Sequence, residues 1–172
     1  MKKIFDAANL VLLFLIGSFV HSWYPRLPER IPSHFDFAGH ADRWSGREGF
    51  FALAAVPFVL TLVFYILARF LPRMARNPRH LNIPHKEEFL KLPEEKQGIY
   101  WGLLREFFAG LVAVMNLLFY AILRGTVRVA AGEAGLLPFR EMLPAFAAMG
   151  LILIVYLWRL TRMPGKLVRG DI

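Results

Sequence analysis

The chain has 172 residues and a formal net charge of +8 at pH 7. Hydrophobic residues make up 56% of it and charged residues 20%, whereas an ordinary soluble domain has about 45–50% and about 25%. Cysteine is absent, which excludes disulfides, thiolate metal sites, iron–sulfur clusters and cysteine nucleophiles.

The hydrophobic residues are gathered into four runs, each near the roughly 20 residues that a helix needs to cross a bilayer. The runs are about Ile4–Tyr24, Gly49–Leu71, Leu103–Leu123 and Met142–Leu160. Because hydrocarbon offers no water to backbone groups, each run must be helical. The sequence therefore predicts an all-α integral membrane protein with four transmembrane helices. A soluble bundle of long buried helices is the alternative, but residues 50–67 have no polar face for water.

The first run carries a polar stripe. No small-x-small cleavage motif follows it, so we expect a retained helix and not a cleaved signal peptide. Asp6, Asn9 and His21 recur at helical spacing along the run. Ionisable groups in a membrane helix usually face the bundle interior or water, and we expect this stripe to do so.

The connection after the first run is rich in proline and aromatic residues. Pro25, Pro28 and Pro32 each restrict φ and hold the segment extended. Gly39 permits a tight turn with positive φ. This composition indicates an ordered loop that covers the outer ends of the helices, and not a flexible linker.

The segment Leu27–Trp44 reads LPERIPSHFDFAGHADRW and lies between two predicted membrane helices. It resembles the bacterial membrane family of the domain of unknown function 1648, a domain that also begins SdpI-like proteins, which are similar to the immunity protein against the sporulation-delaying toxin. The resemblance covers about residues 8–70 and implies a motif that is a candidate for recognition. The motif residues are Pro28, Pro32, His34, Phe35, Gly39, Asp42 and Trp44.

The same loop contains histidine and aspartate in a pattern that could bind a divalent metal. His34, Asp36, His40 and Asp42 are weak candidate ligands, because imidazole and carboxylate together bind zinc and similar ions. The alternative is that His34 and Asp42 hydrogen-bond to loop backbone groups. We therefore commit to no metal and no cofactor.

The middle of the chain is basic and leads into the third run. Residues 69–85 are expected to lie against anionic headgroups, and Pro93 is expected in the first turn of a helix that continues into the membrane. A second polar stripe follows, at Arg105, Asn116 and Tyr120. The two stripes either form interhelical hydrogen bonds or line an outward polar cavity that holds Asn116 together with His21 and His34.

The distribution of Lys and Arg predicts the orientation. Of the 21 such residues, seven fall in the first and third connections: Arg26, Arg30, Arg43, Arg47, Arg124, Arg128 and Arg140. The other fourteen, with every Lys, fall at the two termini and in the middle connection. The positive-inside rule then puts both termini in the cytoplasm. The net charge needs no nucleic-acid partner.

Three segments follow from these patterns. Residues 1–71 form a helix–loop–helix unit, residues 72–102 a cytoplasmic basic loop and helix extension, and residues 103–172 a second transmembrane hairpin with a basic tail.

The leading interpretation is a non-enzymatic, multi-pass protein of the bacterial inner membrane. Its outward loop would serve immunity, sensing or the binding of a peptide or membrane-protein partner, and an oligomer is possible. One alternative is a small metal-assisted membrane hydrolase that uses the His/Asp cluster of the loop. The other is an oligomeric transporter subunit whose polar stripes line a path.

Overall fold

The computed structural model describes residues 1–74 and 82–172. Four long helices run side by side: α1 (Lys2–Trp23), α2 (Gly49–Met74), α4 (Glu94–Ala130) and α5 (Leu143–Arg169). Each is long and apolar enough to cross a membrane, which confirms the prediction of four helices of that length and character. Arg76 and Arg79, which enter the orientation argument, lie outside the described residues.

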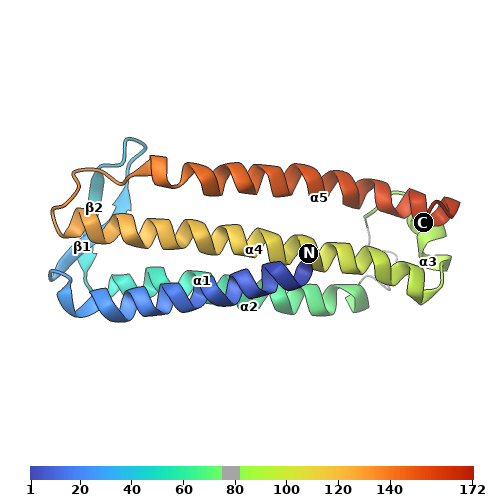
Figure 1. Ribbon diagram of the computed structural model, residues 1–172, viewed down its shortest axis with the longest axis horizontal. Coiled ribbons are helices and arrows are strands. Elements are labelled where there is room, and N and C mark those ends of the chain that lie inside the picture. The colour runs from blue at the N-terminus through green and yellow to red at the C-terminus, as the bar shows by residue number, and fades with distance from the viewer. Residues whose placement is uncertain (75–81) are drawn as a thin grey trace.

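The central helix of the bundle is α4. Figure 1 shows α4 between α5 on one side and α1 and α2 on the other, and α1, α2 and α5 all pack on it. The outer faces of the surrounding helices are apolar and open, with Phe14 of α1 and Ile154 of α5 each 72% exposed. Such broad apolar surface suits lipid and not water, as expected for a multi-pass membrane protein.

The helices extend further than the apolar runs predict. α4 has 37 residues, which is about 56 Å at the helical rise, against a hydrocarbon core of about 30 Å. Arg124 and Arg128, expected in a loop, therefore lie on the last turns of α4. α4 begins at Glu94, immediately after Pro93, close to the predicted start. An apolar run marks only the part of a helix that lies in hydrocarbon. Polar residues can extend the same helix into water, so the helix can be longer than the run.

The expectation of an all-α chain is wrong in the first connection, which contains a β hairpin. A short 3₁₀ turn (Tyr24–Arg26) leads to β1 (Arg30–Phe35), which pairs with β2 (Ala41–Gly46) in antiparallel register. The ladder is irregular between Pro32 and His34, where proline supplies no N–H. An extended, proline-containing segment can therefore form one strand of a hairpin. The hydropathy pattern marks the membrane helices but does not reveal this strand pairing.

The hairpin is packed onto the bundle through β1. Leu27 and Ile31 are buried with Ile16 of α1, Phe50 of α2 and Leu123 of α4 in one apolar cluster. At the tip of the hairpin, the Gly39 carbonyl accepts a hydrogen bond from the Leu137 N–H at 2.8 Å. Leu137 belongs to the connection between α4 and α5, so the hairpin spans the end of the bundle. We call this region, residues 24–48 and 131–142, the hairpin end.

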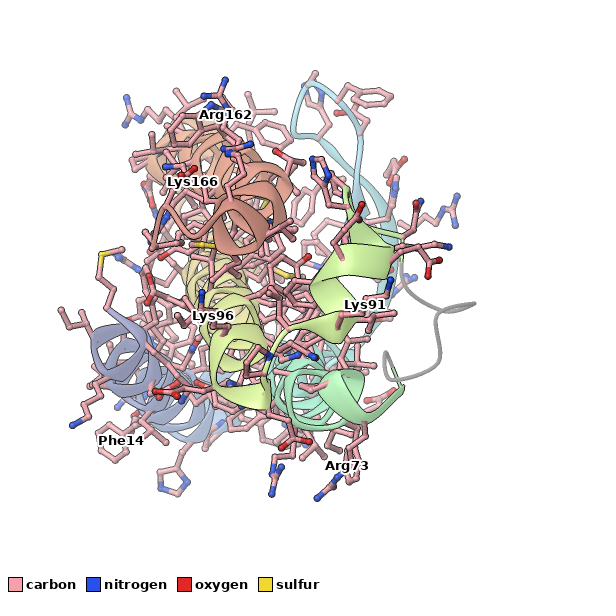
Figure 2. The ribbon with its side chains drawn as sticks, turned by 90° about the vertical axis from the view of Figure 1, so that its right-hand side faces the viewer. Phe14, Arg73, Lys91, Lys96, Arg162 and Lys166 are labelled. Atoms are coloured by element: carbon pink, nitrogen blue, oxygen red, sulfur yellow. The ribbon has the colours of Figure 1, made fainter. Side chains whose placement is uncertain are left out.

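The opposite end contains a second apolar cluster. The short helix α3 (Lys86–Lys91) places Phe89, which has no exposed surface, against the rings of Tyr100 and Trp101 of α4. Leu167 of α5 belongs to the same cluster. We call this region, formed by α3, the start of α4 and the end of α5, the α3 end. Viewed from there, Figure 2 shows cationic side chains of α2, α3, α4 and α5: Arg73, Lys91, Lys96, Arg162 and Lys166.

Candidate functional site

The hairpin brings His34 of β1 and Asp42 of β2 together. Nδ1 of His34 lies 2.6 Å from Oδ1 of Asp42, and the two side chains are 52% and 43% exposed. A carboxylate that engages one ring nitrogen fixes the orientation of the imidazole. Nε2 is therefore the ring nitrogen left for a ligand or partner. Cross-strand neighbours hold this pair at a defined place on an exposed surface.

Asp36 has a structural task in the hairpin turn. Its Oδ1 accepts hydrogen bonds from the N–H groups of Ala38 at 2.9 Å and of His40 at 2.8 Å. The His40 N–H is the main cause that holds the pKa of Asp36 below the usual 3.8. Gly39 completes the turn with a φ of 89°, a conformation that favours glycine. Asp36 thus stabilises the turn that connects β1 to β2.

The four weak metal candidates form two pairs. One pair is His34 with Asp42, and the other is His40 with Asp36, whose Nδ1 and Oδ2 atoms are 3.3 Å apart. Within residues 1–74 and 82–172, no three histidine, aspartate or glutamate side chains are grouped to hold a metal ion. A protein zinc site takes at least three such ligands, so the geometry supplies two incomplete sets and not one complete set.

The motif residues divide into buried and exposed ones. Pro32 and Gly39 are buried and Phe35 is half-buried, whereas Pro28 is exposed and Trp44 is 44% exposed. The aromatic residue at the tip, Phe37, is fully exposed. A Phe in a turn between two paired strands is an unusual placement, and such an aromatic side chain suits the membrane interface.

Two residues of the α1 polar stripe, Asp6 and Asn9, form hydrogen bonds with the neighbouring helices. Oδ1 of Asp6 accepts from the Tyr65 hydroxyl of α2, and Oδ2 of Asp6 from Lys2 Nζ, both at 2.5 Å. Asn9, 2% exposed, donates to the Ala109 carbonyl of α4 at 2.9 Å. The bonds of Asp6 to Tyr65 and of Asn9 to Ala109 join α1 to α2 and α4 and satisfy polar groups that lipid cannot satisfy. The bond to Lys2 lies within α1.

The stripe continues on α4. Asn116 has no exposed surface and donates to Oδ1 of Asn9 at 2.9 Å and to the Thr61 hydroxyl at 3.1 Å. Thr61 and Tyr65, both on α2, complete this network and were not foreseen. A sequence signal for them exists: they are four residues apart in an otherwise apolar helix, which places them on one face.

The other stripe residues lie elsewhere. His21 is exposed and lines a groove with Phe14 and Phe58. Tyr120 packs edge-to-face on Phe19 of α1, with ring centroids 5.7 Å apart. Arg105 lines a pocket between α1, α2 and α4. His21, His34 and Asn116 do not line one common outward cavity, because each of them has different neighbours.

Comparison with known proteins finds a relative of most of the chain and a family match to its first part. An uncharacterized protein of Archaeoglobus fulgidus is 26% identical over 157 residues, which cover 87% of this chain and 83% of that protein. No solved structure matches the chain. Residues 10–61, which include most of α1, the hairpin and the first half of α2, match the family described as a domain of unknown function, DUF1648. The helix–hairpin–helix unit therefore contains the segment that is similar to the DUF1648 family.

Proposed function

We propose that this chain is a non-enzymatic protein of the cytoplasmic membrane whose β hairpin binds an extended peptide segment of a partner outside the cell. The observation that carries this proposal is the open edge of β2. In the described part of the chain, β1 is the only strand that pairs with β2. Asp42, Arg43 and Trp44 in the middle of β2 are all exposed.

An open strand edge favours recognition of extended chain. Its unpaired N–H and C=O groups can pair with another strand, while alternate side chains supply specificity. β1 cannot serve equally well, because its Ile31 and Pro32 are buried against the bundle. The free edge of β2, next to the His34–Asp42 pair, is therefore the edge that we propose for the partner segment.

The hairpin is anchored at both its base and its tip. Ile31 is 2% exposed in the apolar cluster at the base, and Gly39 bonds to Leu137 at the tip. A partner that adds to a preorganised strand does not bear the entropy cost of ordering it. Immunity, sensing and assembly with another membrane protein all require such a presented surface.

The orientation in this proposal rests on the positive-inside rule, and cysteine labelling tests it. The chain lacks cysteine, so Ser33→Cys on the exposed part of β1 and Asn82→Cys at the α3 end each introduce a single reactive thiol. In intact cells, an impermeant maleimide should label Ser33→Cys, and should label Asn82→Cys only after lysis. The reverse pattern would place the hairpin in the cytoplasm and overturn an extracellular partner.

Site-specific photo-crosslinking tests the binding surface. A photoreactive residue at Trp44 should give one discrete protein adduct in native membranes, whereas the same residue at Phe14, on the lipid-facing side of α1, should not. His34→Gln keeps hydrogen-bonding capacity but lacks the imidazole ring, and it should weaken the adduct without lowering thermal stability. Equal adducts at Trp44 and Phe14 would contradict the proposal. Stoichiometric zinc that is lost in His34→Gln would support the metal-assisted hydrolase in its place.

A further inference from the structure

We propose that the chain holds the phosphate group of an anionic lipid in a pocket between α1, α2 and α4. The pocket has a volume of about 150 Å³. One water needs about 10–15 Å³ of such volume, so a phosphate group fits with space left for the adjoining part of a lipid. Six of the lining residues carry the argument: Lys2, Phe64, Ala68, Arg69, Arg105 and Phe108.

The charge balance of the pocket calls for an anion. Arg69 of α2 and Arg105 of α4 have no carboxylate within ion-pair distance among residues 1–74 and 82–172, and Lys2 is paired with Asp6 at 2.5 Å. Other cations of the protein do have such partners: Arg128 lies 2.7 Å from Glu141. Exposed Arg69 and half-buried Arg105, without a carboxylate partner among the described residues, line one partly enclosed space. They favour a phosphate there, because arginine binds phosphate through two parallel hydrogen bonds.

The apolar part of the lining identifies the phosphate source as a lipid. Phe64 and Phe108 lie side by side on α2 and α4, with ring centroids 5.5 Å apart, and most of the lining is apolar. Free phosphate gains nothing from such a surface, whereas the acyl chain of a lipid does. On α2 next to the pocket, Ile66, Leu67 and Phe70 are each more than 40% exposed, as in a surface that faces the bilayer.

The position of the pocket along the bundle agrees with lipid headgroup depth. It lies where α1 begins, at Lys2, and near the last turns of α2. In Figure 1, α4 and α5 continue well beyond that level towards α3. The level at which α1 and α2 end and α4 and α5 continue is the expected membrane boundary, and lipid phosphates lie at that boundary.

Lipid titration of the purified protein tests the proposal. The protein in neutral detergent is mixed with phosphatidylglycerol, phosphatidylcholine or inorganic phosphate, and binding is followed by native mass spectrometry and by the thermal midpoint. We expect saturable one-to-one binding of phosphatidylglycerol, with no comparable effect of the other two. Arg69→Gln and Arg105→Gln should each weaken it about tenfold, the effect expected for the loss of one charge-assisted hydrogen bond.

Two further variants separate the pocket from general attraction to negative lipid. Arg162→Gln removes one positive charge from α5, where Arg162 stacks on Trp158 at 4.8 Å, and it should bind as the unmodified protein does. Ala68→Leu keeps every charge but fills the pocket, and it should abolish one-to-one binding. This variant tests the site even if Arg69→Gln or Arg105→Gln does not fold. Equal weakening by Arg162→Gln, or unchanged binding by Ala68→Leu, would overturn the site. Protection by inorganic phosphate equal to that by the lipid would overturn the lipid as its source.

Discussion

The hairpin end and the α3 end both project beyond the apolar bundle, but they are built differently. At the α3 end, Phe89 is enclosed by the rings of Tyr100 and Trp101, with centroids 5.3 and 6.0 Å away. At the hairpin end, only one strand is packed, and the other exposes Trp44 and the turn residue Phe37. One end therefore buries its aromatic residues and the other displays them.

This difference indicates which end is available for a partner. An aromatic side chain has a large apolar surface, and its exposure in water is unfavourable unless something covers it. The α3 end satisfies this requirement within the chain. The hairpin end does not, because Phe37 and Trp44 remain exposed, and in our proposal a lipid or a partner covers them. The following predictions test the contrast, from the largest expected effect to the smallest.

The strongest test removes the ring at the centre of the α3 end. Phe89→Ala should lower the free energy of unfolding by about 3–5 kcal/mol, as for other buried Phe residues, because Phe89 has no exposed surface. Thermal unfolding in detergent measures this. Lys91→Ala, on the exposed side of the same helix, is the control and should have almost no effect. A small loss for Phe89→Ala would mean that α3 is not firmly packed.

The corresponding test at the hairpin end is Ile31→Ala. Ile31 is 2% exposed and joins the hairpin to the bundle, so the loss should be about 2–5 kcal/mol. Protease treatment should then cut the hairpin of this variant faster than that of the unmodified protein. Ser33→Ala, in the same strand but exposed, should leave the cleavage rate unchanged. Rapid cleavage of the unmodified hairpin would show that it is a loose tether, against our expectation of an ordered loop.

The contact between the hairpin tip and the α4–α5 connection can be broken at Gly39. A Cβ there would meet the Leu137 carbonyl oxygen at 3.0 Å, and φ is +89°. Gly39→Ala should therefore cost about 1–2 kcal/mol from its conformation alone, with more from the contact. Hydrogen exchange of the Leu137 N–H, which bonds to Gly39, should accelerate. Gly132→Ala is a matched control, because φ there is +73° and no atom lies within 4 Å of the added Cβ. Equal acceleration in both variants would exclude the tip contact as the cause.

The smallest effect concerns pH. Because the pKa of Asp36 is lowered in the folded hairpin, chiefly by the His40 N–H, its carboxylate supports the turn above the ordinary value of 3.8. That support is lost as the pH falls through the lower folded pKa. The amide resonances of Ala38 and His40 should shift together in this acidic range. Asp36→Asn should abolish the shift, and an unchanged titration in that variant would assign it to another group.

The sequence alone predicts much of the polar network, but not its complete membership. Asp6, Asn9 and Asn116 stand out because polar groups within apolar runs must be bonded internally. Tyr65 was not foreseen, since a tyrosine near a helix end also suits the membrane interface. Its bond to Asp6 depends on how α2 is rotated against α1. Helix rotation is set by packing over the whole contact between two helices, which a local pattern does not contain.

What the sequence determined by itself is the set of four membrane-spanning helices, because the cost of an unpaired backbone group in lipid leaves an apolar run of about 20 residues no other choice. It also determined the motif of the loop. The tertiary structure alone decided that this loop is a β hairpin, that His34 pairs with Asp42, and that Lys2, Arg69 and Arg105 line one pocket. The His34–Asp42 pair depends on the strand register of one hairpin, and the pocket depends on the packing of helices that are far apart in the chain.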